Sequence, residues 1–140
     1  MNEQTKPLIF SIAPEWINEI LQGRKTYELR RRPPKLLEAT RAYLYETRPS
    51  SRIRVRCVMG PVVCKPKELL WEMLGEKTRV TKVAFDAYFR DLETGSAISI
   101  DQVEDLGSEF TLPRLRLVGF SPPQAWCRAS ADVAEMVEGR

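Results

Sequence analysis

The sequence predicts an α+β fold in which strands predominate, a small mixed or antiparallel β-barrel with flanking helices. Runs of strand length follow one another too closely for the long crossovers that a parallel βαβ sheet requires. Helical patterns separate some of these runs near the start, in the middle and at the end of the chain. No internal repeat and no low-complexity segment interrupts this order, which favours one barrel covered by helices.

The first part of the chain carries a strand, a helix and a second strand. The apolar run 8–12 has the length of a strand, and Pro14 then begins a helix at a position where its missing N–H costs nothing. Gly23 is suited to end this helix in the left-handed conformation. Alternation of side chains over 26–32 predicts the next strand.

Two more strands and a helix are predicted in the middle of the chain. Residues 41–47 are rich in β-formers. Residues 53–63 alternate apolar side chains with arginines, and the Gly-Pro pair within them is expected to break the strand. The segment 66–74 predicts a short helix that ends at Gly75.

The last part of the chain is predicted to hold two helices and two strands. Thr81 is a suitable N-cap for a helix whose apolar residues recur at helical spacing and which stops at Gly95. Strands are expected at 97–106 and 114–120. The segment 130–138 is expected to form a loosely attached terminal helix.

One domain accounts for the 140 residues. We expect an N-terminal tail at 1–6, the domain at 7–128, and a C-terminal helix or tail at 129–140. No apolar run approaches the roughly 18 residues that span a bilayer, and the N-terminal residues lack an apolar leader. Three cysteines without close pairing are typical of free thiols in the cytoplasm. The sequence therefore predicts a cytoplasmic protein without membrane contact.

Positive charge is concentrated in one part of the chain. Between Arg24 and Arg56 there are 11 Lys or Arg and 3 Asp or Glu, although the whole chain carries a net charge of only +3. Such segregation favours a polyanionic partner such as nucleic acid. The alternative is a solvated basic strand edge that deters pairing with other chains.

The composition excludes several kinds of site. Because the chain has no histidine, it lacks the commonest acid–base group near neutral pH and any Ser-His-Asp triad. The three scattered cysteines do not have the paired spacing of a zinc site. Residues 23–26 resemble the end of a P-loop but lack its first glycine and the strand that precedes it. We therefore expect neither a metal nor a cofactor.

Three charged residues, Lys25, Glu28 and Arg30, follow the first helix at short spacing. Strand alternation places Glu28 and Arg30 on one face, and Lys25 lies at the corner between helix and strand. If that face is buried, the charges must be partnered, because an unpaired buried charge is costly. The residues either neutralise one another or form the charged floor of a pocket, where a buried lysine exchanges protons with a carboxylate.

Aromatic residues are candidates for stacking on nucleic-acid bases. Tyr43, Tyr45, Trp71 and Trp126 are available for this role. Trp71, like Trp16, lies on an apolar helical face that is typical of the core. Trp126 follows a proline-rich loop and is therefore the better candidate.

The segment Gly23-x-Lys25-x-x-Glu28-x-Arg30 resembles the G-x-K-x-x-E-x-R signature of the ASCH domain family, which belongs to the PUA-like β-barrels. Other segments resemble the family in the same order and together span about residues 7–128. These segments are 8–12 with the helix after it, 43–49, Trp71, Tyr88-Phe89, 97–100 and 120–126.

The resemblance implies a PUA-like barrel with a cleft lined by the signature residues, and a role in RNA binding or RNA-linked regulation. Some small ASCH proteins hydrolyse N4-acylated cytidine with a lysine, a threonine and a glutamate, and others are described as ribonucleases. Lys25 matches that lysine, whereas Glu28 occupies the position of the threonine. The glutamate of that reaction has no assigned position in this chain.

Three functions are open at this point. The first is a protein that binds single-stranded RNA or a nucleoside-like ligand, with Lys25, Glu28 and Trp126 around a base. The phosphates would bind a set of arginines, namely Arg30, Arg31, Arg32, Arg52 and Arg54.

The second function is a hydrolase that acts on N4-acylcytidine or on single-stranded RNA, with Lys25, Glu28 and Tyr43 or Tyr45 as catalytic residues. The third is a ligand sensor that meets a protein partner through exposed apolar residues of the terminal helix, such as Val133 and Val137.

Overall fold

Six strands and five helices make up the described part of the computed structural model, residues 6–139. The strands are β1 (Leu8–Ile12), β2 (Tyr27–Arg30), β3 (Thr40–Glu46), β4 (Arg52–Pro66), β5 (Thr94–Thr111) and β6 (Trp126–Arg128). The helices are α1 (Pro14–Leu21), α2 (Lys67–Thr78), α3 (Lys82–Tyr88), α4 (Leu112–Arg116) and α5 (Ala131–Glu138). Most of the predicted tail at 1–6, and the last residue of the predicted segment 129–140, lie outside the described residues.

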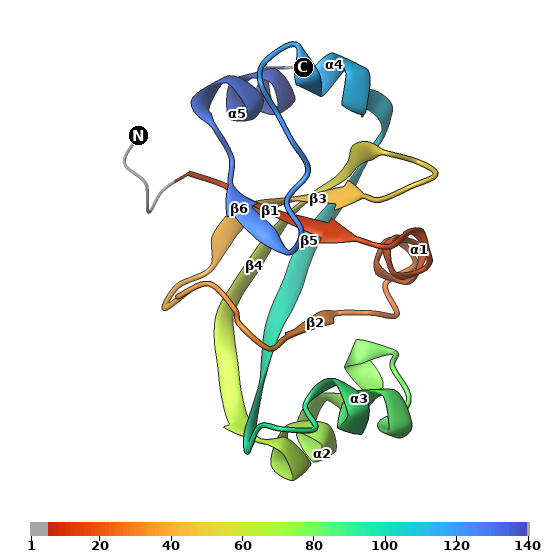
Figure 1. The fold of residues 1–140 in the computed structure, drawn as a ribbon, viewed down its shortest axis with the longest axis vertical. Helices are drawn as coiled ribbons and strands as arrows, with labels where there is room; N and C mark the ends of the chain where they lie inside the picture. The colour runs from red at the N-terminus through yellow and green to blue at the C-terminus, as the bar shows by residue number, and fades with distance from the viewer. Residues whose placement is uncertain (1–5, 140) are drawn as a thin grey trace.

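All six strands belong to one sheet, in the order β2-β5-β4-β3-β1-β6. β1 and β3 pair in parallel, and the other neighbours pair antiparallel. The sheet curls into a half-barrel. Helices α4 and α5 lie at one end of it, α2 and α3 at the other, and α1 beside the end of β1 (Figure 1). The α+β fold with a mixed, mostly antiparallel sheet and flanking helices is confirmed.

Three groups of buried apolar side chains hold these layers together. The central group joins α1, through Ile17 and Ile20, to the inner face of β1, β3 and β4. A second group packs α5 and the segment around α4 against the sheet. The third group packs α2 and α3 on β2 and on the far ends of β4 and β5, around Leu70, Phe85 and Phe89.

The strand predicted at 114–120 is wrong. Residues 112–116 form α4 instead, with Pro113 in its first turn. Within 114–120 only Leu115 and Phe120 are buried. This burial pattern lacks the period of two that a half-buried strand needs. The residues before them extend β5 into one strand of 18 residues.

The predicted end of a helix at Gly75 is also wrong, because α2 continues to Thr78. Gly75 serves close packing inside the helix: a Cβ at this position would lie 2.7 Å from Cδ2 of Trp71. Arg79 adopts the left-handed conformation after the helix, with φ of 66°. The expected break in β4 at Gly60-Pro61 is a shift of register within a continuous strand.

The C-terminal helix is firmly attached, contrary to expectation. Val133 and Val137 are buried, so they are not available to a protein partner. Just before α5, the short strand β6 pairs with β1. The sequence pattern did not predict this strand, because it follows a proline-rich loop. Among residues 6–139, no helix has the length and apolar character to cross a membrane.

Candidate functional site

The corner between α1 and β2 places Lys25 at the base of a pocket. Gly23 leaves the helix with φ of 79°, a conformation that favours glycine. The backbone N–H groups of Arg24 and Lys25 then both donate to the carbonyl oxygen of Glu19. The N–H of Thr26 donates to the carbonyl of Lys77, which fixes the corner to the end of α2.

Lys25, Glu28 and Arg30 come together around one carboxylate. Nζ of Lys25 lies 3.5 Å from Oε1 of Glu28, and Nη2 of Arg30 lies 2.8 Å from Oε2. The three side chains are only 3%, 13% and 14% exposed. The predicted convergence of the signature residues is therefore present, and their functional roles stay predictions.

The Lys25 ammonium loses its proton more readily in this environment than it would in water. Burial lowers the pKa of Lys25 below its usual range, and the Glu28 carboxylate partly opposes this shift. Nζ donates to the carbonyl of Thr78 over 2.8 Å and lies 5.1 Å from the ring centre of Trp16. Since an ammonium has three donors, one direction is left for a ligand after Thr78 and Glu28.

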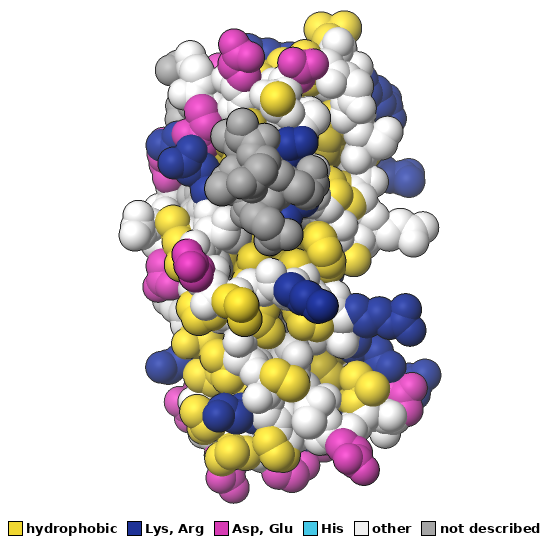
Figure 2. All heavy atoms as spheres, turned by 90° about the vertical axis from the view of Figure 1, so that its left-hand side faces the viewer, with side chains coloured by type: hydrophobic (Ala, Val, Ile, Leu, Met, Phe, Trp, Pro, Cys, Tyr) yellow, Lys and Arg dark blue, Asp and Glu magenta, His cyan; other side chains and the backbone are white. Residues whose placement is uncertain are grey.

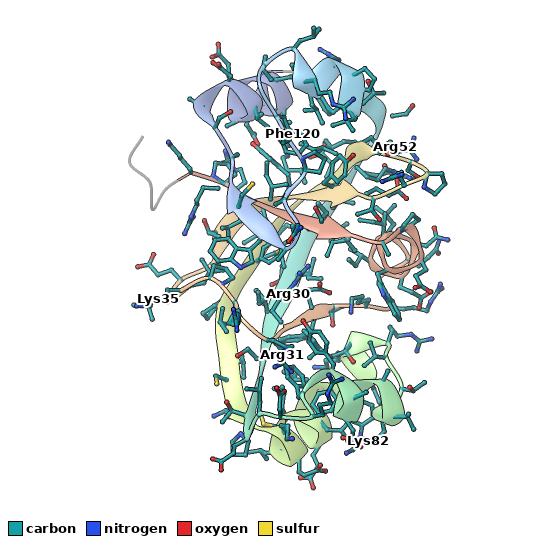
Figure 3. All side chains as sticks on the ribbon, in the orientation of Figure 1. Arg30, Arg31, Lys35, Arg52, Lys82 and Phe120 are labelled. Atoms are coloured by element: carbon teal, nitrogen blue, oxygen red, sulfur yellow. The ribbon has the colours of Figure 1, made fainter. Side chains whose placement is uncertain are left out.

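Arg30 projects into the space between β1 and β2, as its label in Figure 3 shows. Its Nη2 donates to the carbonyl oxygen of Ser11 over 3.3 Å, and the guanidinium lies 5.1 Å from the ring centre of Phe10. Its buried Nε has no partner among the described residues. Buried donors are normally satisfied. Because this Nε is enclosed, a ligand would contact the exposed part of the Arg30 guanidinium instead.

These residues form the floor of a cavity of about 270 Å³, which we call the Lys25 pocket. This volume lies near the lower end of ligand pockets, roughly 300–1,000 Å³, and suits a single ring system. The pocket is lined by Ser11, Ile12, Ala13, Trp16, Lys25, Glu28, Leu29, Arg30, Val80, Ala84, Phe85 and Tyr88. A charged floor is thus enclosed by aromatic walls from α1 and α3.

A second cavity, of about 570 Å³, lies on the other side of the end of β1, and we call it the Arg48 pocket. It is lined by Ser11, Tyr45, Thr47, Arg48, Ser51, Leu112, Arg116, Pro122, Pro123 and Gln124. Ser11 lines both pockets. Tyr45, a predicted candidate, therefore lies in a pocket, but in a different one from Lys25.

The arginines of β4 have partners across the sheet. Arg52 lies 3.1 Å from Glu46, and Arg54 contacts both Glu46 and Asp105. Arg56 binds Glu104 and Glu138 at 2.6 and 2.7 Å. Arg52 and Arg54 therefore belong to a ladder of ion pairs, and neither of them lines a pocket.

The remaining predicted RNA contacts, Arg31, Arg32 and Trp126, line neither pocket. Arg31 binds Asp91 at 2.8 Å and the carbonyl of Tyr88 at 2.7 Å. Arg32 is exposed. Nε1 of Trp126 donates to the Arg32 carbonyl over 3.1 Å, and the Trp126 ring packs against the central apolar group.

Tyr43 is not near Lys25. Its side chain is fully buried in the group that packs α5, and its hydroxyl donates to Glu138 over 2.7 Å. Burial first, and then the Glu138 contact, raise the pKa of Tyr43 above its ordinary value. This tyrosine therefore has the environment of a structural residue, and the structure does not bring it to the predicted catalytic group.

Sequence reasoning missed the aromatic walls and the second basic cluster. Trp16, Phe85 and Tyr88 fit the core pattern of amphipathic helices. Trp16 and Phe85 do contribute to the apolar groups as well as to the pocket, and the Tyr88 ring contacts Phe89. Arg48 and Arg116 come from a turn and from an unpredicted helix. The one available signal was the turn Arg48-Pro49-Ser50-Ser51 after β3, because functional residues are often found on loops.

No single-sign surface covers the side of the molecule seen in Figure 2, where basic, acidic and hydrophobic side chains are interspersed. Within residues 6–139, no group of three or more His, Cys, Asp or Glu side chains is placed to hold a metal ion.

Comparisons with known proteins point to one group of relatives. A Zymomonas mobilis protein named ASCH domain-containing ribonuclease is 26% identical over 120 residues, which cover 78% of this chain and 81% of that protein. A crystal structure of ASCH from Zymomonas mobilis superposes with a TM-score of 0.88 at 23% identity and covers 96% of this chain and 95% of that chain. A single-residue variant of that protein gives 0.87 at 25% identity and covers 99% and 98%. No profile of a known protein family matches the chain.

Proposed function

Because this chain belongs to the ASCH domain family, we propose that it is an RNA-binding protein that holds one exposed base of a single strand in the Lys25 pocket. One observation carries the proposal: a largely buried carboxylate, 13% exposed and between two cations, forms the floor of a cavity walled by Trp16 and Tyr88. The name of the Zymomonas mobilis relative, a ribonuclease, supports RNA as the polymer.

The chemistry of the pocket suits a nucleobase. Aromatic walls favour a flat ring, because stacking on a base contributes about 1–3 kcal/mol. The Glu28 carboxylate accepts hydrogen bonds from ring or exocyclic N–H groups, while the Arg30 guanidinium donates to carbonyl oxygens and ring nitrogens. A paired base in a helix cannot enter such a cavity, so an unpaired base of a single strand is the expected ligand.

The test is a titration of fluorescently labelled single-stranded RNA of mixed sequence, monitored by anisotropy at low salt. We expect micromolar or tighter binding by the wild-type protein. Glu28→Gln keeps the shape of the side chain but weakens its contact with two cations and with the base, so we expect at least tenfold weaker binding. Glu76→Gln, on an exposed position of α2, is the matched control and should bind like wild type. Wild-type protein that shows no binding at low salt would contradict the proposal.

A second candidate function is hydrolysis of RNA or of an N4-acylated cytidine. It is favoured by the lowered pKa of Lys25 beside Glu28, a pair that is suited to proton transfer. Turnover of single-stranded RNA or N4-acylcytidine should then be present in wild type and lost in Lys25→Ala. Equal turnover by both proteins would exclude this role for Lys25.

We place the protein in the cytoplasm as part of this proposal. Cys57, Cys64 and Cys127 are free thiols, and unpaired cysteines are the normal state in a reducing compartment. RNA is accessible in the same compartment.

A further inference from the structure

Ser11 separates the two pockets and contacts both. Its carbonyl oxygen accepts a hydrogen bond from Arg30, on the side of the Lys25 pocket. Its hydroxyl donates to the carbonyl of Pro123 over 2.6 Å, in the loop that lines the Arg48 pocket. The two cavities therefore lie on opposite sides of one residue, at the end of β1.

The Arg48 pocket contains two cations and no carboxylate. Arg48 and Arg116 are exposed, and no hydrogen bond or ion pair with another residue in 6–139 involves either guanidinium. The arginines of β4, in contrast, all contact acidic residues. The other polar groups of the pocket are hydroxyls and one amide, from Tyr45, Thr47, Ser51 and Gln124.

This set of groups has the chemistry of a phosphate site. Guanidiniums bind phosphate oxygens through paired N–H donors, and hydroxyl and amide groups supplement them. No carboxylate in the lining opposes an anion. At about 570 Å³ the cavity is larger than the Lys25 pocket, so it also has room for a ribose beside the phosphate.

We infer that the Arg48 pocket binds an internal phosphodiester of the same RNA strand whose base occupies the Lys25 pocket. The inference rests on the proposed function and extends it from one base to a strand that passes over Ser11. Phosphate contacts position a strand and base contacts select it. The two pockets thus divide these tasks between the two sides of β1.

The test measures anisotropy of labelled single-stranded RNA with a 5′-hydroxyl at several salt concentrations. The double variant Arg48→Gln/Arg116→Gln should bind about tenfold more weakly than wild type. The slope of log affinity against log salt should become shallower by about 0.7 for each phosphate that the variant no longer neutralises.

The control variant, Lys77→Gln/Arg90→Gln, removes the same charge from exposed positions outside both pockets. It should change affinity less than twofold. Because Arg48 and Arg116 have no described partner, the thermal midpoints of both double variants should stay close to that of wild type.

Three results would overturn the inference. One is a double variant that binds like the Lys77/Arg90 control, with the wild-type salt slope. Another is an effect of Arg48 and Arg116 that occurs only with 5′-phosphorylated RNA, since the site would then hold a terminal phosphate. The last is a stoichiometry of two strands per protein. The same titrations distinguish this inference from the proposed function. If the wild-type protein binds RNA, and binding is weakened by Glu28→Gln but not by Arg48→Gln/Arg116→Gln, only this inference fails. If wild type binds no RNA, the proposed function fails as well.

Discussion

Arginines in two regions of this molecule have opposite surroundings. On β4, Arg52, Arg54 and Arg56 face a row of carboxylates from neighbouring strands and from α5. Around the end of β1, Arg30 keeps an unsatisfied Nε, and Arg48 has no described partner. All of these residues lie in the segment that carries the excess of positive charge. A count of charges therefore locates a basic segment. The acidic residues around each arginine, most of them far along the chain, decide which cations can bind a ligand.

Arg30 and Arg52 should differ most strongly in their contribution to RNA binding. Arg30→Gln removes a donor from the Lys25 pocket, so RNA affinity should fall tenfold or more, in line with about 1.5–3 kcal/mol for a hydrogen bond to a charged group. Arg52→Gln removes the same charge from the ladder and should change affinity less than twofold. Anisotropy titrations of both variants measure the difference. An equal decrease in both would show that β4 also contacts RNA.

The next effect concerns stability. Glu46 is buried and contacts both Arg52 and Arg54. Glu46→Gln weakens two ion pairs, so the free energy of unfolding should fall by about 1–2 kcal/mol, less than for a fully buried pair because both arginines are partly exposed. Urea denaturation measures this change. Glu72→Gln, on an exposed position of α2, should leave stability unchanged, and RNA affinity should not fall in either variant.

A weaker effect is a loss of folding stability at acidic pH. The Arg54 contact lowers the pKa of Asp105 to about 2 from 3.8, with help from the backbone N–H of Gly107. The pKa of Asp105 is lower in the folded protein than in the unfolded chain. The ionised carboxylate therefore stabilises the fold above pH 4, and this stabilisation is lost as the pH falls toward 2. Asp105→Asn should therefore destabilise the protein at pH 6, by less than about 1 kcal/mol since the carboxylate is half exposed. The difference from wild type should shrink between pH 4 and pH 2 in denaturant titrations. A difference that stays constant over this range would mean that the ion pair contributes nothing.

The sequence predicted the local part of the site and missed the long-range part. Strand alternation was sufficient to place Glu28 and Arg30 together, because β2 is a regular strand paired with β5. The pairing of Arg54 with Asp105 joins residues 51 positions apart, and no local pattern reports such a contact. The same holds for Trp16 and Tyr88, whose helical spacing fits a core and a pocket wall equally well.

The fold was predicted more completely than the site for a related reason. Strand and helix periods are local, so most elements were found within a few residues. Of the two elements that were missed, one has a local cause and the other a long-range cause. In α4, Pro113 in the first turn favoured a helix where the apolar residues suggested a strand. In β6, three residues form a strand only because β1 offers a free edge.

The pairing of β1 with β6 bears on how the protein folds during its synthesis. β1 leaves the ribosome long before residues 126–128, which form one of its two neighbours in the sheet. The N–H of Ala129 then donates to the carbonyl of Pro7, which extends the same pairing by one more hydrogen bond. Contacts so distant in sequence slow folding. The nascent chain must therefore keep one edge of its first strand unpaired until β6 has emerged, and the complete sheet closes only after that point.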